Sequence, residues 1–215
     1  MRLVSWNVRK AVGLDWRRDP ARVLAVLADL EPDVVLLQEA DKRLGPRPAA
    51  LPPAMAARAG FHAVDAAPGP SLGWHGNAVL LRGTLRAAEI RCIDLPGLEP
   101  RGAVAVRVGA LWICGAHLGL RRGDRRRQMA ALLGQLPSPA VIGGDFNEWS
   151  HDPSALGIAP PWRMTVPGPS FHAAKPVMAL DRFVARGVRL HAAAVVPPEA
   201  ARRASDHLPV RVEVG

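Results

Sequence analysis

Short apolar runs are the feature that most constrains how this chain folds. Most have the length of a β-strand, are rich in Val, Ile and Leu, and are bounded by Gly, Pro or polar residues. None approaches the roughly 18 consecutive apolar residues that a membrane-spanning helix needs. We predict strands over residues 3–8, 34–37, 78–81, 85–92, 104–108, 111–116, 140–143, 180–184, 190–196 and 210–214.

Only a few segments show the 3.6-residue period of a helix. Asp19 followed by Pro20 is typical of a helix start, and apolar residues then recur at i, i+3, i+4 and i+7 until Pro32. Asp124 is the expected N-cap of a second helix, which two prolines end. Many strands and few helices predict one domain of α/β or α+β class over residues 1–215.

Other segments give weaker indications. A short helix is expected over residues 53–59, and residues 149–176 are predicted to form a long irregular loop. Cys92 and Cys114 lie in apolar runs, so we expect two buried free thiols. Met1 is followed directly by a strand-like run without a secretory apolar region, which predicts a cytoplasmic protein. The oligomeric state is left open, with a monomer favoured.

The charge is strongly positive. Lys and Arg number 28 against 19 Asp and Glu, a net charge of +9, and nearly all the cations are arginines. One interpretation is compositional drift in a chain rich in Ala, Pro and Gly; the other is a phosphate-bearing partner such as DNA or RNA. The run over 121–127 carries five arginines. It fits either a phosphate-backbone contact or a solvated helix start.

Six predicted strands have polar side chains within them or at one end that strand propensity does not explain. Loops at strand ends, held by a rigid sheet, are where functional side chains usually lie. The residues are Asn7, Glu39, His117, Asp145 with Asn147, Asp181, and Asp206 with His207.

Oxygen donors dominate this set. Carboxylates and amides such as those of Glu39, Asp145, Asp206, Asn7 and Asn147 suit Mg²⁺ or Mn²⁺, whereas no Cys/His spacing indicates zinc. Histidines add groups that ionise near neutral pH. A divalent metal, carboxylates and histidines together indicate hydrolysis of a phosphate ester.

The order of these motifs resembles that of a known group of proteins. The chain resembles the endonuclease/exonuclease/phosphatase superfamily, the DNase I-like metal-dependent phosphoesterases, and the matching motifs run from residue 3 to residue 214. The resemblance implies a four-layer α/β/β/α sandwich, with two mixed sheets face to face and helices outside. The matching stretches are Ser5-Trp6-Asn7-Val8, Leu37-Gln38-Glu39, Gly76-Asn77-Ala78-Val79-Leu80, Arg101-Gly102-Ala103, Ala116-His117-Leu118, Gly143-Gly144-Asp145-Phe146-Asn147, Leu180-Asp181-Arg182 and Ser205-Asp206-His207.

The resemblance also implies a metal and a water. Glu39 would be the principal Mg²⁺ ligand, with Asn7 beside it and Asp206 on or near the metal. Asp145 would orient or deprotonate the attacking water. Asn147 would help to hold that water or the phosphate.

Further residues would contact the phosphate. His207 would touch the scissile phosphate while Asp181 fixes its ring. His117 would stand near the leaving group. Asn77 and Arg101 match positions that hold phosphate oxygens.

Two departures from the pattern matter. Arg9 stands where some relatives have an acidic residue, which would add phosphate-binding charge and remove a potential ligand. The chain also has no tyrosine, so no phenol can contact the phosphate. Trp74, Trp149 and Trp162 fall in predicted loops near the site, and Trp16 in the first loop; they could stack a base, cover an acyl or sugar group, or simply pack.

The sequence thus predicts a Mg²⁺-dependent phosphodiesterase or nuclease that acts on nucleic acid. Two alternatives remain. One is hydrolysis of a small phosphorylated metabolite or lipid head group. The other is a non-catalytic protein of the same fold that binds nucleic acid.

Overall fold

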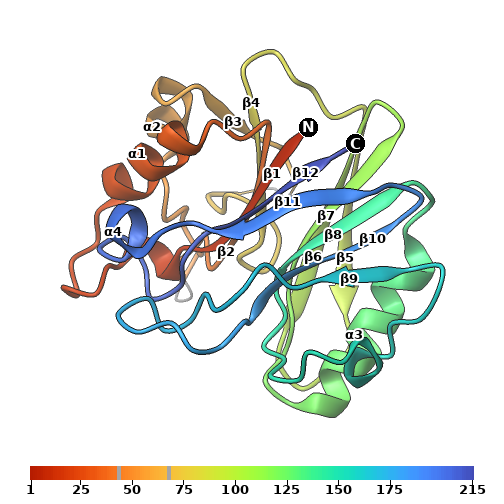
Figure 1. Ribbon diagram of the computed structural model, residues 1–215. Coiled ribbons are helices and arrows are strands. Elements are labelled where there is room, and N and C mark those ends of the chain that lie inside the picture. Colours follow the sequence, from red (N-terminus) through yellow and green to blue (C-terminus); the bar gives the residue numbers. More distant parts are fainter. Residues whose placement is uncertain (43–44, 67–68) are drawn as a thin grey trace.

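The computed structural model describes residues 1–42, 45–66 and 69–215. Two mixed six-stranded sheets face one another with helices on their outer surfaces, as the resemblance implied (Figure 1). The first sheet has the order β11-β12-β1-β2-β4-β3 and the second β5-β6-β7-β8-β10-β9. No helix in the described ranges is both long and apolar enough to cross a membrane.

The strands of the first sheet are β1 (Arg2–Asn7), β2 (Val34–Gln38), β3 (Phe61–Ala63), β4 (Ala78–Arg82), β11 (Leu190–Val195) and β12 (Val210–Val214). Those of the second are β5 (Glu89–Leu95), β6 (Arg101–Val108), β7 (Leu111–His117), β8 (Ala140–Asp145), β9 (Arg163–Thr165) and β10 (Asp181–Arg186). The helices are α1 (Pro20–Leu30), α2 (Pro53–Arg58), α3 (Arg122–Gln135) and α4 (Pro198–Ala201), with 3-10 turns η1 (Arg9–Ala11) and η2 (Pro153–Leu156).

An apolar layer between the sheets holds them together. Leu36 of the first sheet and Ile113, Val141 and Phe183 of the second are all fully buried there. Each such side chain contributes roughly 1.5–3 kcal/mol to stability through burial. A Cβ on Gly143 of β8 would lie 2.8 Å from Leu36 Cδ1 of the opposite sheet, so glycine is needed for the close approach of the sheets at this position.

Two further apolar clusters anchor the helices. One lies under α1 and α2 on the first sheet, and the other joins α3 and η2 to the second sheet. In Figure 1, α1, α2 and α4 accordingly lie on one side of the molecule and α3 on the other. Asn7, His117 and Asp145 are the last residues of β1, β7 and β8.

Parallel pairing brings these strand ends together. β1 pairs with β2 in parallel, and β7 with β8 in parallel, so the carboxyl ends within each pair lie at the same edge. In the second sheet His117 is in register with Asp145, and Asp145 is in register with Asp181 of the antiparallel β10. One row across three strands therefore carries three polar side chains.

Several sequence-based predictions are confirmed. Asp19 caps α1, because its side chain accepts hydrogen bonds from the backbone N–H groups of Ala21 and Arg22. The short helix predicted near residue 53 is present as α2. Cys114 is a buried free thiol, and burial raises its pKa to about 12.

Others are wrong. Asp124 does not cap α3; Arg121 is at the N-cap, and Asp124 lies buried in the first turn, where Arg127 donates to it. The strand predicted over 85–92 lies at 89–95, because Leu85 N–H closes a turn onto Arg82 O. Cys92 is exposed rather than buried, since only one face of the edge strand β5 is covered.

Short elements escaped sequence analysis. The segment 149–176 contains η2 and β9, and β3 and α4 were not predicted. Each is only three or four residues long. Such lengths are too short for a hydrophobic period to be recognised.

Candidate active site

Asp145 is the residue on which the candidate site converges. Its side chain is buried, and Asn7 Nδ2 donates a hydrogen bond of 3.0 Å to Asp145 Oδ2. His117 Nε2 lies 3.3 Å and His207 Nε2 3.7 Å from the same oxygen. The backbone N–H of Asn147 donates to the other oxygen, Oδ1, at 3.0 Å. Asp145, at the end of β8 in one sheet, is therefore bonded to Asn7 at the end of β1 in the other.

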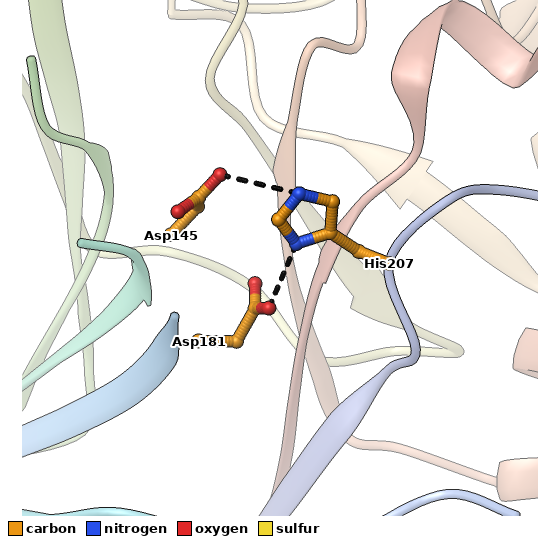
Figure 2. A group of neighbouring side chains, drawn as sticks. All are labelled: Asp145, Asp181 and His207. Carbon is orange, nitrogen blue, oxygen red and sulfur yellow. Dashed lines mark hydrogen bonds and ion pairs between the residues drawn. The ribbon is translucent and has the colours of Figure 1, made fainter. Parts of the chain in front are cut away.

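His207 is held between two carboxylates. Figure 2 shows its ring between Asp145 and Asp181, with Nδ1 2.9 Å from Asp181 Oδ2. Ser170 Oγ donates to the same Asp181 oxygen at 2.6 Å. Burial alone would lower the pKa of His207, but the charges of Asp181 and Asp145 outweigh it and raise the pKa to about 10. His207 is thus an imidazolium near neutral pH.

The backbone around His207 is fixed from the first sheet. Trp6, buried in the core, donates from its indole Nε1 to His207 O at 2.8 Å. Ser205 Oγ donates to Asn7 O at 2.7 Å, and the His207 N–H lies 3.3 Å from Ser205 Oγ. These bonds tie the end of β1 to the segment before β12 and hold Asn7 beside His207.

Glu39 faces a separate cation. Directly after β2, its carboxylate forms an ion pair with the ammonium of Lys10. Glu39, His117 and Arg101 line one cavity of about 270 Å³. Lys10 had no role in the sequence-based prediction, although its position three residues after Asn7, among only three lysines of the chain, was a usable signal.

The remaining predicted phosphate contacts have partners within the chain. Arg9 Nε lies 3.4 Å from Asp206 Oδ2. Arg101 is paired with Glu99 at 2.7 Å. Asn77 is fully buried and donates from Nδ2 to Gly102 O at 2.8 Å, while its Oδ1 has no hydrogen-bond partner among the described residues.

A buried ion pair holds the loop that follows Asp145. Arg125 donates from Nε and Nη2 to Glu148 Oε2 at 3.1 and 2.9 Å. Glu148 Oε1 accepts from the backbone N–H groups of Trp149 and Ser150. Within the arginine run, Arg125 therefore supports this loop from α3.

Several residues around the site have a left-handed backbone. Non-glycine residues pay for this conformation and retain it where surrounding contacts require it, often at functional sites. The residues are Arg9 (φ 45°), Lys10 (φ 60°), Glu39 (φ 51°), His75 (φ 48°) and Asn147 (φ 51°).

The donor set fits a divalent cation. Asp145, Asp181 and His207 lie close enough together to be considered as ligands, but Asp181 is fully buried and engaged with His207 and Ser170. Glu39 is the better candidate, because its carboxylate lines the cavity and already attracts a cationic group. Asn7 and Asp206 also carry oxygen donors, the kind of ligand that Mg²⁺ prefers, and both contact Arg9.

The chain is similar to proteins already known from their sequences or solved structures. The chain is 31% identical to the uncharacterized protein YbhP of Escherichia coli K12 over 160 residues. The match covers 66% of this chain and 63% of YbhP. The match therefore spans less than two thirds of that relative.

Solved structures share the fold across the whole chain. The endonuclease/exonuclease/phosphatase protein of Beutenbergia cavernae has a TM-score of 0.74 at 22% identity, covering 100% of this chain and 71% of that protein. D. rerio TDP2, solved in complex with a single-strand DNA product, has a TM-score of 0.76 at 20% identity, covering 100% and 98%. With residues 4–207 matching its sequence pattern, the chain belongs to the Endonuclease/Exonuclease/phosphatase family.

Proposed function

We propose that this protein is a divalent-metal-dependent phosphoesterase that hydrolyses phosphodiester bonds in nucleic acid. The observation that carries the proposal is the convergence of Asn7, His117 and His207 on one buried oxygen of Asp145. A carboxylate surrounded by donors and two histidines can bind a water and transfer its proton.

Each residue has a role in this reaction. Asp145 orients the water and accepts its proton as the new P–O bond forms. The imidazolium of His207 lies beside the phosphate and offsets the charge that develops there, while Asp181 holds its ring. As the P–O bond to the leaving group breaks, His117 protonates the leaving oxygen. Because His117 lies 3.3 Å from Asp145, a proton transfer between them restores both groups.

The metal and the arginines complete the site. Bound Mg²⁺ or Mn²⁺, held by Glu39 with Asn7 and Asp206 beside it, would polarise a phosphoryl oxygen. Arg101 lines the same cavity as Glu39 and would contact a phosphate oxygen there. Asn77 anchors the start of β6, which carries Arg101, through its bond to Gly102.

Nucleic acid is favoured as substrate by the net charge of +9 and by the DNA product bound to the structurally similar D. rerio TDP2. The cavity of about 270 Å³ favours a second candidate, hydrolysis of a small phosphorylated metabolite. Such a volume is near the lower end for small-molecule sites.

A metal-supplemented assay tests the proposal. Single-stranded and duplex DNA, abasic DNA, RNA, nucleotides, inositol phosphates and sphingomyelin would be compared with Mg²⁺, Mn²⁺ or EDTA. We expect metal-dependent cleavage of a nucleic acid that Asp145→Ala abolishes and the exposed control Asp29→Ala retains. Cleavage of the metabolites alone would favour the second candidate. Binding of DNA without turnover of any substrate would identify a non-catalytic protein.

A further inference from the structure

Trp16 is an exposed aromatic residue beside the candidate site. Its side chain is 77% exposed, and it belongs to none of the three apolar clusters found among the described residues. It lies in the segment 8–19 between β1 and α1, which directly follows Asn7. Packing therefore does not explain the presence of an indole at this position.

The segment holds Trp16 in a fixed place. Lys10, Ala11 and Trp16 all have left-handed backbones, with φ of about 60° each. Hydrogen bonds maintain them: Lys10 N–H donates to Glu39 O, Asp19 N–H to Ala11 O and Trp16 N–H to Gly13 O, at 2.8–3.0 Å. A backbone fixed in this way needs no further ordering when its side chains bind a ligand.

Arg9 connects Trp16 to the candidate site. Its guanidinium lies 4.4 Å from the centroid of the Trp16 ring, and its Nε lies 3.4 Å from Asp206 Oδ2. Arg9 also donates from its backbone N–H to Asn7 Oδ1. One guanidinium thus reaches from the indole to the predicted metal ligands.

We propose that Trp16, with Arg9 against its ring, forms a subsite that stacks the nucleobase adjoining the scissile phosphate. The inference rests on the proposed function and specifies its substrate class. Stacking between bases and aromatic side chains is worth roughly 1–3 kcal/mol per base and tolerates any sequence. In this subsite Arg9 faces the phosphate and Trp16 the base of the same nucleotide.

The surroundings favour a base over an acyl chain. The neighbours Asp15, Arg17 and Arg18 are exposed charged residues, so the residues next to the indole in the sequence are charged rather than apolar. An acyl chain needs a continuous apolar surface, whereas a nucleotide combines one flat ring with a phosphate charge. A single indole beside guanidinium groups matches that combination.

Two chromogenic phosphodiesters with the same leaving group test the subsite. Thymidine 5′-(4-nitrophenyl phosphate) carries a base, and methyl 4-nitrophenyl phosphate does not. For Trp16→Ala we expect KM for the thymidine ester to rise at least fivefold with kcat within twofold, and no change for the methyl ester. Trp16→Phe should restore most of the affinity. Ile90→Ala shortens an exposed apolar side chain on the edge strand β5 and should leave both esters unchanged.

Two results would overturn the inference. Equal losses on both esters would show that Trp16 acts only by positioning Arg9. Unchanged kinetics on both would show that it contacts no base.

A binding measurement separates this inference from the proposed function. Oligothymidylate and an abasic oligomer of equal length would be titrated in EDTA into wild-type protein and Trp16→Ala. We expect the wild type to prefer the oligomer with bases, and the variant to lose that preference. That result without hydrolysis of any ester would preserve the subsite and refute the phosphoesterase. Equal binding of both oligomers by the wild type, or Trp16-dependent binding to phosphatidylserine vesicles in its place, would refute the subsite.

Discussion

Asp181 Oδ2 accepts two short contacts, one from His207 Nδ1 at 2.9 Å and one from Ser170 Oγ at 2.6 Å. Asp181 and Ser170 are fully buried, and His207 is nearly so. Three separate segments are joined here, since Ser170 precedes β10, Asp181 begins it and His207 precedes β12. Asp181 therefore sets both the orientation and the charge of the histidine.

Replacing Asp181 by Asn should impair catalysis through His207. The amide keeps the shape but removes the charge, so the pKa of His207 should fall from about 10. On the proposed mechanism we expect kcat to drop by a factor on the order of 10²–10⁴. NMR titration of the His207 ring in metal-free protein tests the cause. Ser170→Ala, which removes one hydrogen bond, should cost about tenfold or less. An unchanged His207 pKa in Asp181→Asn would contradict this role.

Replacing Lys10 by Met should strengthen metal binding. The ammonium of Lys10 competes for Glu39, and a partly exposed ion pair is worth about 0.5–1 kcal/mol, or two- to fivefold in affinity. Isothermal titration with Mn²⁺ should show that decrease in Kd. Lys175→Met removes an exposed lysine of the same charge and should leave Kd unchanged. An equal or weaker affinity in Lys10→Met would show that no competition occurs.

Replacing Arg125 by Met should destabilise the protein. The substitution leaves the carboxylate of Glu148 buried without its guanidinium partner, a loss of about 3–5 kcal/mol in the free energy of unfolding. Urea denaturation measures the loss. Arg126 is the neighbouring exposed arginine, and Arg126→Met should change stability by about 0.5 kcal/mol or less. Similar losses in the free energy of unfolding for the two variants would show that Arg125 has no such structural role.

The stability that Glu148 contributes should disappear in acid. Burial raises its pKa, but hydrogen bonds from Ser150 N–H and from Arg125 outweigh burial and leave the pKa below its usual value. A lowered pKa in the folded state means that the contribution is complete above the ordinary pKa of about 4.5 and is lost as pH falls through the folded value. The difference in unfolding free energy between wild type and Glu148→Gln should therefore shrink below pH 4.5. A constant difference down to pH 3 would contradict this.

Sequence patterns predicted the sheets well and their short elements poorly. Strands such as 34–37 and 111–116 are continuous apolar runs because both of their faces are covered, and that pattern is visible without a structure. Asp124 was misassigned because an acidic residue near a helix start fits either the cap or the first turn. Its side chain instead meets Arg127 and the Leu98 N–H.

The candidate site was also predicted in part. Polar residues at strand ends identified Asp145, His117, Asp181 and His207, which the structure brings into contact. The hydrogen bond from Ser170 to Asp181 was not predicted, because Ser170 lies in an irregular segment and nothing local to it indicates that bond. The ion pair of Lys10 with Glu39 was not predicted either, because its partner lies 29 residues away in the sequence.

The sequence by itself determined most of the strands and which of their ends carry acids, amides and histidines, because the hydrophobic pattern of a strand and the residues that flank it are local properties. Only the tertiary structure decided which cation faces which acid: Lys10 with Glu39, Arg9 with Asp206, and Arg125 with Glu148. With 28 basic and 19 acidic side chains available, many pairings are open to the unfolded chain. Coulomb attraction falls with distance, so the fold selects the pairs by bringing them within a few ångströms of one another.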